Sequence, residues 1–140
     1  MSTEQNKAVV RRMVEVSNQR NLDALDELVA TDFVNHAPDA GEIPAGAEGL
    51  KQFSRMLMSA FPDSDWGIDD LIAEGDKVVM RWTSHGTHQG EAWGIPATRR
   101  PIVVTGISIY RVVDGKLAEA WQEVDMIGLM QQLGVGAPAH

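Results

Sequence analysis

The stretch that decides the fold is residues 115–134, GKLAEAWQEVDMIGLMQQLG. The turn dipeptide Asp114-Gly115 leads into it, and such a pair typically closes a two-residue hairpin. Residues 116–124 then alternate as a strand does, and one face of that strand carries Leu117, Glu119, Trp121 and Glu123. Asp125 falls on the same face, after which apolar residues recur every three positions, which predicts a helical turn. If this face looks into a cavity, Asp125 is a candidate general base.

Three further strands are expected upstream of this one. Residues 66–74 and 77–85 alternate and are joined by the Gly75-Asp76 turn, and residues 102–112 form a hairpin with the last strand. Residues 86–101 hold three glycines and two prolines, so they are expected to form a long exposed loop.

The first half of the chain predicts three helices. Ser2 and Gln5 have capping-box spacing, and an apolar stripe follows to about Gln19. Asn21 can cap a second, shorter helix that extends to Val29, and residues 50–60 predict a third. Between the second and third lie a short extended segment, residues 32–36, and a turn-rich loop or lid, residues 37–49. Helices followed by strands indicate an α+β domain, with helices covering one face of a mainly antiparallel sheet.

The composition of the chain indicates which kinds of partner it can bind. The 140 residues are enough for one domain, expected at 1–134 with a loose tail at 135–140. The formal charge of −8 disfavours nucleic acid and anionic membranes, so a neutral or apolar ligand is favoured. There is no cysteine, and no apolar run approaches the roughly 18 residues of a membrane span. The N-terminus lacks the apolar core of a signal peptide, so a cytoplasmic location is expected.

Several motifs together resemble the SnoaL-like polyketide cyclase family, which has the NTF2-like fold. The residues that carry the resemblance are Phe61-Pro62-Asp63, Gly75-Asp76-Lys77-Val78, Arg81-Trp82, Gly86-Thr87-His88-Gln89-Gly90, Gly94-Ile95-Pro96, Gly106-Ile107-Ser108, Asp114-Gly115-Lys116 and Gln131-Gln132-Leu133-Gly134. The resemblance implies a cone in which three N-terminal helices pack on a strongly curved, mainly antiparallel sheet that encloses a pocket. It also implies a homodimer and a reaction without cofactor.

The resemblance assigns the acid/base role to an aspartate at the end of the last long strand, which by position matches Asp125. The alternative is structural, because aspartate is a favoured helix cap and also forms ion pairs. His36 is the second catalytic candidate, as a donor to an enolate oxygen or a proton relay; the alternative is a loop histidine bonded to local backbone. Asn35 stands beside it and is expected to bind substrate.

Arg81 has two interpretations of equal weight. Pointing inward it would pair with a carboxylate or bind a substrate carbonyl; pointing outward it would be a solvated arginine. The remaining residues expected at the pocket are Phe33, Phe53, Trp121, Glu123 and Met126. His85 and His88 lie on opposite faces of a continuous strand, so no metal site is expected.

The function expected from these residues is that of a cyclase or isomerase in which an aspartate acts on an activated carbonyl compound in an apolar pocket. By the resemblance, this reaction is the aldol ring closure of a polyketide ester. Two alternatives stay open: an epoxide-hydrolase-like enzyme, and a small-molecule-binding protein without turnover. In each case the partner is a small apolar or aromatic ligand.

Overall fold

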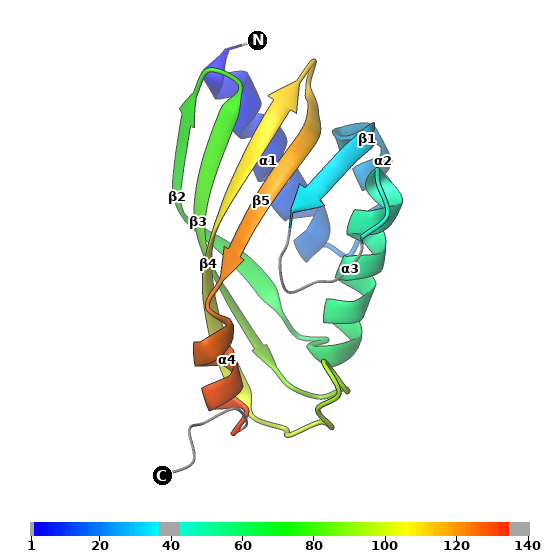
Figure 1. Ribbon diagram of the computed structural model, residues 1–140, viewed down its shortest axis with the longest axis vertical. Helices are drawn as coiled ribbons and strands as arrows, with labels where there is room; N and C mark the ends of the chain where they lie inside the picture. The colour runs from blue at the N-terminus through cyan, green and yellow to red at the C-terminus, as the bar shows by residue number, and fades with distance from the viewer. Residues whose placement is uncertain (1, 37–42, 135–140) are drawn as a thin grey trace.

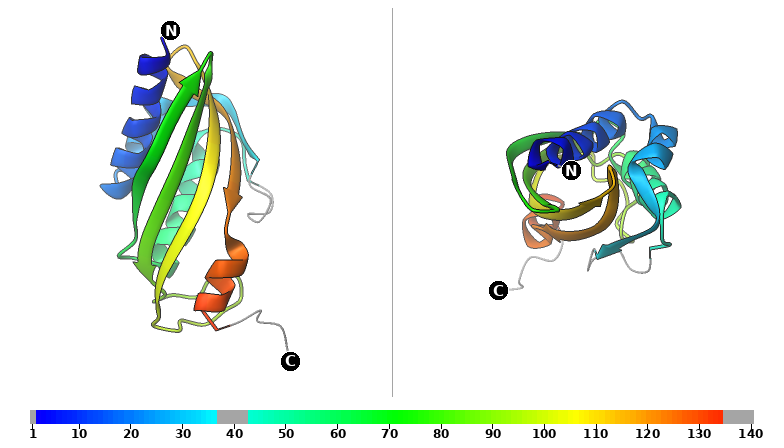
Figure 2. Two further views of the ribbon diagram at one scale, coloured as in Figure 1. Left: turned by 90° about the vertical axis from the view of Figure 1, so that its left-hand side faces the viewer. Right: turned by 90° about the horizontal axis from the view of Figure 1, so that it is seen from above.

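The computed structural model describes residues 2–36 and 43–134 (Figure 1). One sheet runs in the strand order β1-β5-β4-β3-β2, with α1 and α3 on the same side of it (Figure 2). The elements, in chain order, are α1 (Thr3–Asn18), the short 3-10 helix η1 (Leu22–Ala24), α2 (Leu25–Leu28), β1 (Val29–His36), α3 (Ala47–Ala60), β2 (Asp65–Glu74), β3 (Lys77–Thr87), β4 (Pro101–Val113), β5 (Lys116–Val124) and α4 (Met126–Gln132).

The predicted first helix is confirmed as α1. Ser2 accepts a hydrogen bond from the Gln5 amide while the Gln5 side chain accepts one from the Ser2 amide, so both halves of the capping box form. The buried face carries Val10, Met13 and Val14, at the spacing of one helical stripe. That face packs against β2 and β3 and covers one end of the sheet.

The second helix is shorter than predicted and the extended segment is longer. Between Asn21 and Val29, helical structure is limited to η1 and the four residues of α2, and the Asn21 side chain makes no capping hydrogen bond. Val29 adopts extended geometry with φ −121° and ψ 129°, and it pairs with Leu117. An apolar run this short fits a helix or a strand equally well, and pairing with β5 decides it. Because β1 is parallel to β5, the sheet is mixed.

The other four strands form where the sequence predicts them. The hairpin between β4 and β5 turns at Asp114 and Gly115, whose φ angles of 51° and 78° are both positive, as a tight two-residue turn requires. All pairings from β2 to β5 are antiparallel. The third helix is confirmed as α3, while residues 37–42 of the expected loop lie outside the described residues.

The expected strong curvature of the sheet is wrong. Bending a sheet sharply needs bulges, since these let one strand coil relative to its neighbour. The central pair, β3 and β4, keeps an unbroken register from the Lys77 and Arg111 pair to the Thr87 and Pro101 pair. Register shifts are confined to other positions, for example near Asp69 in β2. The sheet is therefore not strongly curved.

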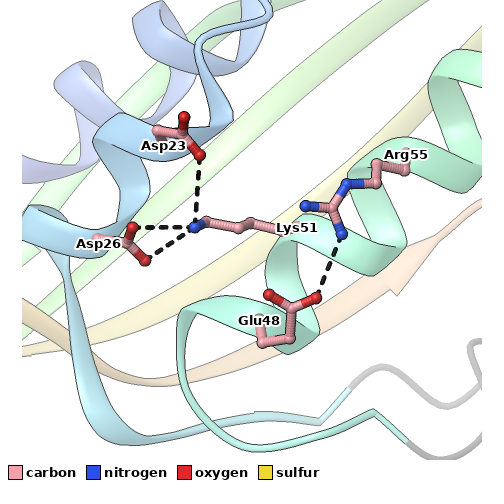
Figure 3. A network of polar contacts seen from close by, with 5 residues as sticks. All are labelled: Asp23, Asp26, Glu48, Lys51 and Arg55. Atoms are coloured by element: carbon pink, nitrogen blue, oxygen red, sulfur yellow. Dashed lines mark hydrogen bonds and ion pairs between the residues drawn. The ribbon is translucent and has the colours of Figure 1, made fainter.

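A cluster of charged side chains fixes α3 to the segment before β1 (Figure 3). The Nζ of Lys51, a side chain that is 10% exposed, lies 2.9 Å from Asp26 and 3.7 Å from Asp23. The hydrogen bond with Asp26 raises the pKa of Lys51 above its ordinary value. One turn along α3, Arg55 pairs with Glu48 at 3.2 Å. The Arg55–Glu48 pair lies within α3, whereas the contacts of Lys51 hold α3 over the β1 side of the sheet, where it forms one wall of a cavity.

No helix within residues 2–36 and 43–134 is long and apolar enough to cross a membrane.

Candidate functional site

A cavity of about 150 Å³ lies between the inner face of the sheet and the helices α1 and α3. The side chains of α3 that line it are Leu50, Phe53, Ser54, Leu57 and Met58. The sheet contributes Trp82 and Ser84 from β3, Ile102, Val104 and Tyr110 from β4, and Gln122 and Val124 from β5. Met126 and Leu129 bring α4 to the same wall. The cavity is therefore assembled from both halves of the chain.

Aromatic rings form much of this lining. Trp66 and Trp82 stack with ring centroids 5.5 Å apart and planes 12° apart, and Phe61 and Trp93 contact each other with centroids 6.3 Å apart. Gly106, opposite Trp82 on β4, makes room for its indole, since a Cβ there would lie 2.3 Å from a ring carbon of Trp82. Aromatic walls of this kind favour flat, unsaturated ligands.

A short chain of hydrogen bonds crosses the sheet behind the aromatic wall. The Trp82 indole N–H donates to the Ser108 hydroxyl at 2.9 Å, and that hydroxyl in turn donates to the Gln122 side-chain oxygen. Burial raises the pKa of the Tyr110 phenol, while hydrogen bonds with Gln122 and Ser108 oppose the rise. Tyr110 therefore remains protonated at neutral pH and is available as a hydrogen-bond donor.

Asn35 reaches the cavity from β1, as the sequence predicts for a substrate-binding residue. Its Oδ1 is buried and has no hydrogen-bond partner among residues 2–36 and 43–134. A buried amide oxygen without a partner costs about 1–3 kcal/mol, so such atoms are rare unless a ligand or water completes them. Among the predicted site residues, Phe53 and Met126 also line the cavity, whereas Phe33 is fully buried in the core beside it.

The face of β5 that carries Asp125 looks away from the cavity, so that part of the prediction is corrected. The inward residues of β5 are Ala120, Gln122 and Val124, and Asp125 is exposed. Its Oδ1 accepts a hydrogen bond from the Gly128 amide at 2.9 Å and caps α4. The prediction ran the alternation unbroken from Leu117 to Asp125, but the register of β5 with β4 shifts between Leu117 and Glu119. The fully buried Leu117 therefore lies on the inner face, and Glu119 and Trp121 lie on the outer one.

His36 also lies on the outer face. Its Nε2 is 2.8 Å from a Glu119 oxygen, and its ring stacks on Trp121 with centroids 5.5 Å apart. Arg111 bonds the other Glu119 oxygen at 3.1 Å, and the two partners together lower the pKa of Glu119. His36 and Trp121, both predicted at the pocket, thus belong to a surface cluster on the opposite side of the sheet.

The Arg81 side chain points outward, in agreement with the second of its two interpretations. Its Nε lies 2.6 Å from Asp70 and its Nη1 lies 3.6 Å from Asp69, with half of the arginine side chain exposed. Arg81 shares a shallow outer depression with Glu123 and Asp125. Glu123, too, was expected to bind substrate, and it lies outside the cavity.

The two histidines near the end of β3 lie in different surroundings. His85 is exposed, whereas His88 is fully buried and its Nδ1 accepts a hydrogen bond from the Thr98 amide at 3.2 Å. Among the described residues there is no group of three or more side chains suited to hold a metal ion.

Tyr110 and Gln122 are polar cavity-lining residues that the sequence analysis did not single out. Gln122 lies on the face of β5 opposite the one that was predicted to look into a cavity. A signal was present in β4, since the polar-tipped residues Ser108 and Tyr110 alternate with the apolar residues Ile107 and Ile109. Of the cavity-lining residues that the structure describes, none carries a carboxylate or an imidazole.

Comparison with protein families gives one match that spans nearly the whole chain. A family model described as SnoaL-like polyketide cyclase matches residues 7–133.

Individual relatives agree with that match. The chain is 30% identical over 133 residues to the aklanonic acid methyl ester cyclase DnrD of Streptomyces peucetius, covering 90% of this chain and 88% of the relative. It is 28% identical over 123 residues to the nogalonic acid methyl ester cyclase of Streptomyces nogalater, with 87% and 92% covered. Among solved structures, TsrD from Streptomyces laurentii superimposes with a TM-score of 0.86 at 30% identity, covering 96% of this chain and 98% of TsrD.

Proposed function

This chain belongs to the SnoaL-like polyketide cyclase family, and from that premise we propose that it closes a ring in a polyketide ester by a cofactor-independent intramolecular aldol reaction. The observation that carries the proposal is the cavity itself, with six aromatic side chains and a neutral polar group of Asn35, Tyr110 and Gln122. The curated relatives are named as cyclases of polyketide methyl esters, which are uncharged at the ester group. An apolar cavity suits such a compound.

In the proposed aldol reaction, the protein would mainly position the substrate and form hydrogen bonds with it. A water molecule in the cavity would take a proton from the carbon next to a carbonyl, and that carbon would bond to a second carbonyl carbon of the same molecule as the C=O π bond opens. The resulting alkoxide would take the proton back, so nothing is oxidised or reduced. The aromatic walls would hold the flexible chain folded on itself. Neutral donors at the sheet, such as the Tyr110 hydroxyl, would stabilise the oxygen on which negative charge develops.

Catalytic roles for Asp125 and His36 stay predictions, and the geometry favours other residues. Asp125 caps α4 and His36 bonds Glu119, both on the outer face of the sheet. A ligand in the cavity would be separated from both side chains by the sheet.

The direct test is to incubate the protein with aklanonic acid methyl ester and follow the mixture by liquid chromatography with mass detection. The expected product has the mass of the substrate and a different retention time, because ring closure is an isomerisation. Heat-denatured protein is the control. Formation of the same product at equal rates with and without folded protein would contradict the proposal.

A second candidate is a binding protein without turnover. It is favoured by one observation: no carboxylate or imidazole lines the cavity among the described residues. Trp66, Trp82 and Trp93 line the cavity, so quenching of intrinsic fluorescence reports binding. Saturable quenching with no new product would favour this candidate over the cyclase.

The epoxide-hydrolase alternative receives less support. The arginine flanked by two aspartates, Arg81 with Asp69 and Asp70, is exposed on the outer face and not in the cavity. Incorporation of oxygen from labelled water into the hydrolysis product of an epoxide probe would support that alternative.

A further inference from the structure

The C-terminal end of α1 is tied to the start of β2 by one asparagine. The side-chain amide of Asn18 donates to the Trp66 carbonyl at 2.9 Å, and its Oδ1 accepts from the Trp66 amide, also at 2.9 Å. Because β2 is an edge strand, Asn18 takes the place of a neighbouring strand at this one residue. Trp66 in turn stacks on Trp82 in the cavity lining. Asn18 therefore holds the backbone that carries one of the aromatic walls.

Arg20 ties the same end of α1 to the connection between α3 and β2. Its Nη2 donates to the carbonyl of Pro62 at 3.0 Å and to that of Ser64 at 2.6 Å. Its Nη1 donates over 3.4 Å to the carbonyls of Ser17 and Asn18 within α1. One guanidinium group thus bridges two segments that are more than 40 residues apart in the chain.

The backbone of Arg20 has a conformation that favours glycine. The Arg20 amide donates to the Ser17 carbonyl at 3.1 Å and the Asn21 amide donates to the Val16 carbonyl at 2.9 Å, which is the Schellman pattern of a helix end. This pattern needs a positive φ at the first residue beyond the cap, and Arg20 has a φ of 63°. Glycine reaches that region without steric cost, whereas arginine does not. The helix end alone would therefore favour glycine, and the contacts of the guanidinium group account for an arginine.

Asn18 and Arg20 also lie where the cavity reaches the protein surface. Of the cavity-lining residues that the structure describes, Asn18, Arg20 and Trp93 are exposed. Ser17 and Ser64 line the cavity next to the first two, so the wall is polar here. α1 lies alongside β2 at this edge of the sheet (Figure 2). At this end of α1, side-chain hydrogen bonds close the gap between the helix and the segment 62–66.

We propose that Asn18 and Arg20 form a latch, and that small molecules enter and leave the cavity where these two side chains separate from residues 62–66. Water can replace hydrogen bonds at an exposed position, so breaking them costs little net free energy. Parting the apolar walls elsewhere would expose apolar surface to water. An enzyme and a binding protein both have to admit a ligand, so the inference goes beyond the proposed function and does not depend on turnover.

The first test needs no ligand and measures how readily a small neutral quencher reaches the cavity. The chain has four tryptophans, and replacing Trp93 and Trp121 by phenylalanine leaves Trp66 and Trp82, which both line the cavity. Collisional quenching of their fluorescence by acrylamide is recorded in this double variant, which serves as the reference.

Two substitutions remove the latch in that background. Asn18→Ala removes both hydrogen bonds with Trp66. Arg20→Gly removes those with Pro62 and Ser64, and it is expected to fold because glycine fits the left-handed position. Loss of two hydrogen bonds should raise the population of the open state about 5- to 100-fold. The acrylamide quenching constant should therefore rise in both variants.

The second test measures the rates of ligand exchange. 2-Acetylnaphthalene, a flat neutral ketone, is mixed with the protein in a stopped-flow instrument while quenching of tryptophan fluorescence is followed. Loss of the latch should raise the association and dissociation rate constants together, by about 5- to 100-fold, and leave the Kd nearly unchanged. A residue that only contacts the ligand would mainly change the dissociation rate constant. If the ketone does not bind, the acrylamide result decides.

Arg12→Gln is the matched control, because Arg12 is an exposed arginine of α1 that pairs with Glu15 and does not line the cavity. It should match the reference in both tests. Circular dichroism and thermal unfolding check that each variant is folded. Unchanged quenching and unchanged rates in folded Asn18→Ala and Arg20→Gly would overturn the proposal, and ligand entry beside Trp93 would then be favoured. A rise in the dissociation rate constant alone would also overturn it.

Discussion

Replacing Asp125 is expected to cost stability, because its carboxylate caps a helix. Asp125 Oδ1 accepts from the Gly128 amide at 2.9 Å, and α4 has only seven residues, so one cap is a large share of its local stabilisation. Alanine at such a position costs about 1 kcal/mol, within a range of about 0.5–2 kcal/mol. Asparagine caps almost as well, so Asp125→Asn loses only the attraction between charge and helix dipole, about 0.3–1 kcal/mol.

A double-mutant cycle with Gly128 isolates the cap. A Cβ on Gly128 would lie 2.3 Å from Asp125 Oδ2, so Gly128→Ala in the wild-type chain must displace the carboxylate. In the Asp125→Ala background that conflict is absent, and alanine should gain its usual helix preference of about 0.5–1 kcal/mol. The expected coupling between the two positions is about 1 kcal/mol.

The measurement is equilibrium unfolding in urea at neutral pH, followed by tryptophan fluorescence. Turnover and probe binding of Asp125→Ala are recorded in parallel and should match the wild-type protein, because the cavity lies on the other face of the sheet. The reasoning fails if both Asp125→Asn and Asp125→Ala gain more than about 0.5 kcal/mol, since relief of that kind is typical of a catalytic group held at a cost to stability. Asp125 would then regain its place as the general base.

Three further predictions concern stability. His36 and Arg111 lower the pKa of Glu119 from its ordinary value of 4.5, so the stability that Glu119 contributes is fully present above that value and is lost as the pH falls through the lowered pKa. The difference in unfolding free energy between the wild-type protein and Glu119→Gln should therefore shrink steadily as the pH is lowered below about 4.5. Lys51→Met should lower the thermal unfolding midpoint, because two carboxylates on the segment before β1 lose their shared cation. Arg55→Met, on the exposed side of α3, should change the midpoint little. Equal shifts in the two variants would contradict the idea that Lys51 holds α3 in place. Gly106→Ala should cost about 1–3 kcal/mol in urea unfolding by displacing the Trp82 ring, whereas a neutral result would show that the indole can move.

Local chemistry made most of the fold predictable. The capping box, the paired turn residues of the last hairpin and the period-two alternation of four strands each act over a few residues. Such local patterns could not predict which distant segments pair as strands. The segment 29–36 becomes a full strand only because it pairs with β5, and the limited curvature of the sheet agrees with the unbroken register of β3 with β4.

The site was predictable only in part. Asn35, Phe53 and Met126 were correctly placed at the cavity, but alternation alone cannot say which face of a strand is buried when both faces mix polar and apolar residues. Trp121 suggested an apolar face, and in the fold its ring is covered by His36 on the outside. Three polar side chains of the inner face, Trp82, Ser108 and Gln122, bond one another across three strands, a condition visible only in the folded chain. The expected homodimer and the domain boundaries stay predictions.

The parallel pairing of β1 with β5 also bears on how the cavity comes into being during folding. Asn35 and Ala120, partners in that pairing, are far apart in sequence, so closing this contact carries a large loop entropy and belongs to the slow class of β-sheet contacts. During synthesis β1 stays unpaired until its partner β5 has left the ribosome. The part of the cavity wall that Asn35 and Ala120 form is therefore assembled late, and the time course of ligand binding would report when folding is complete.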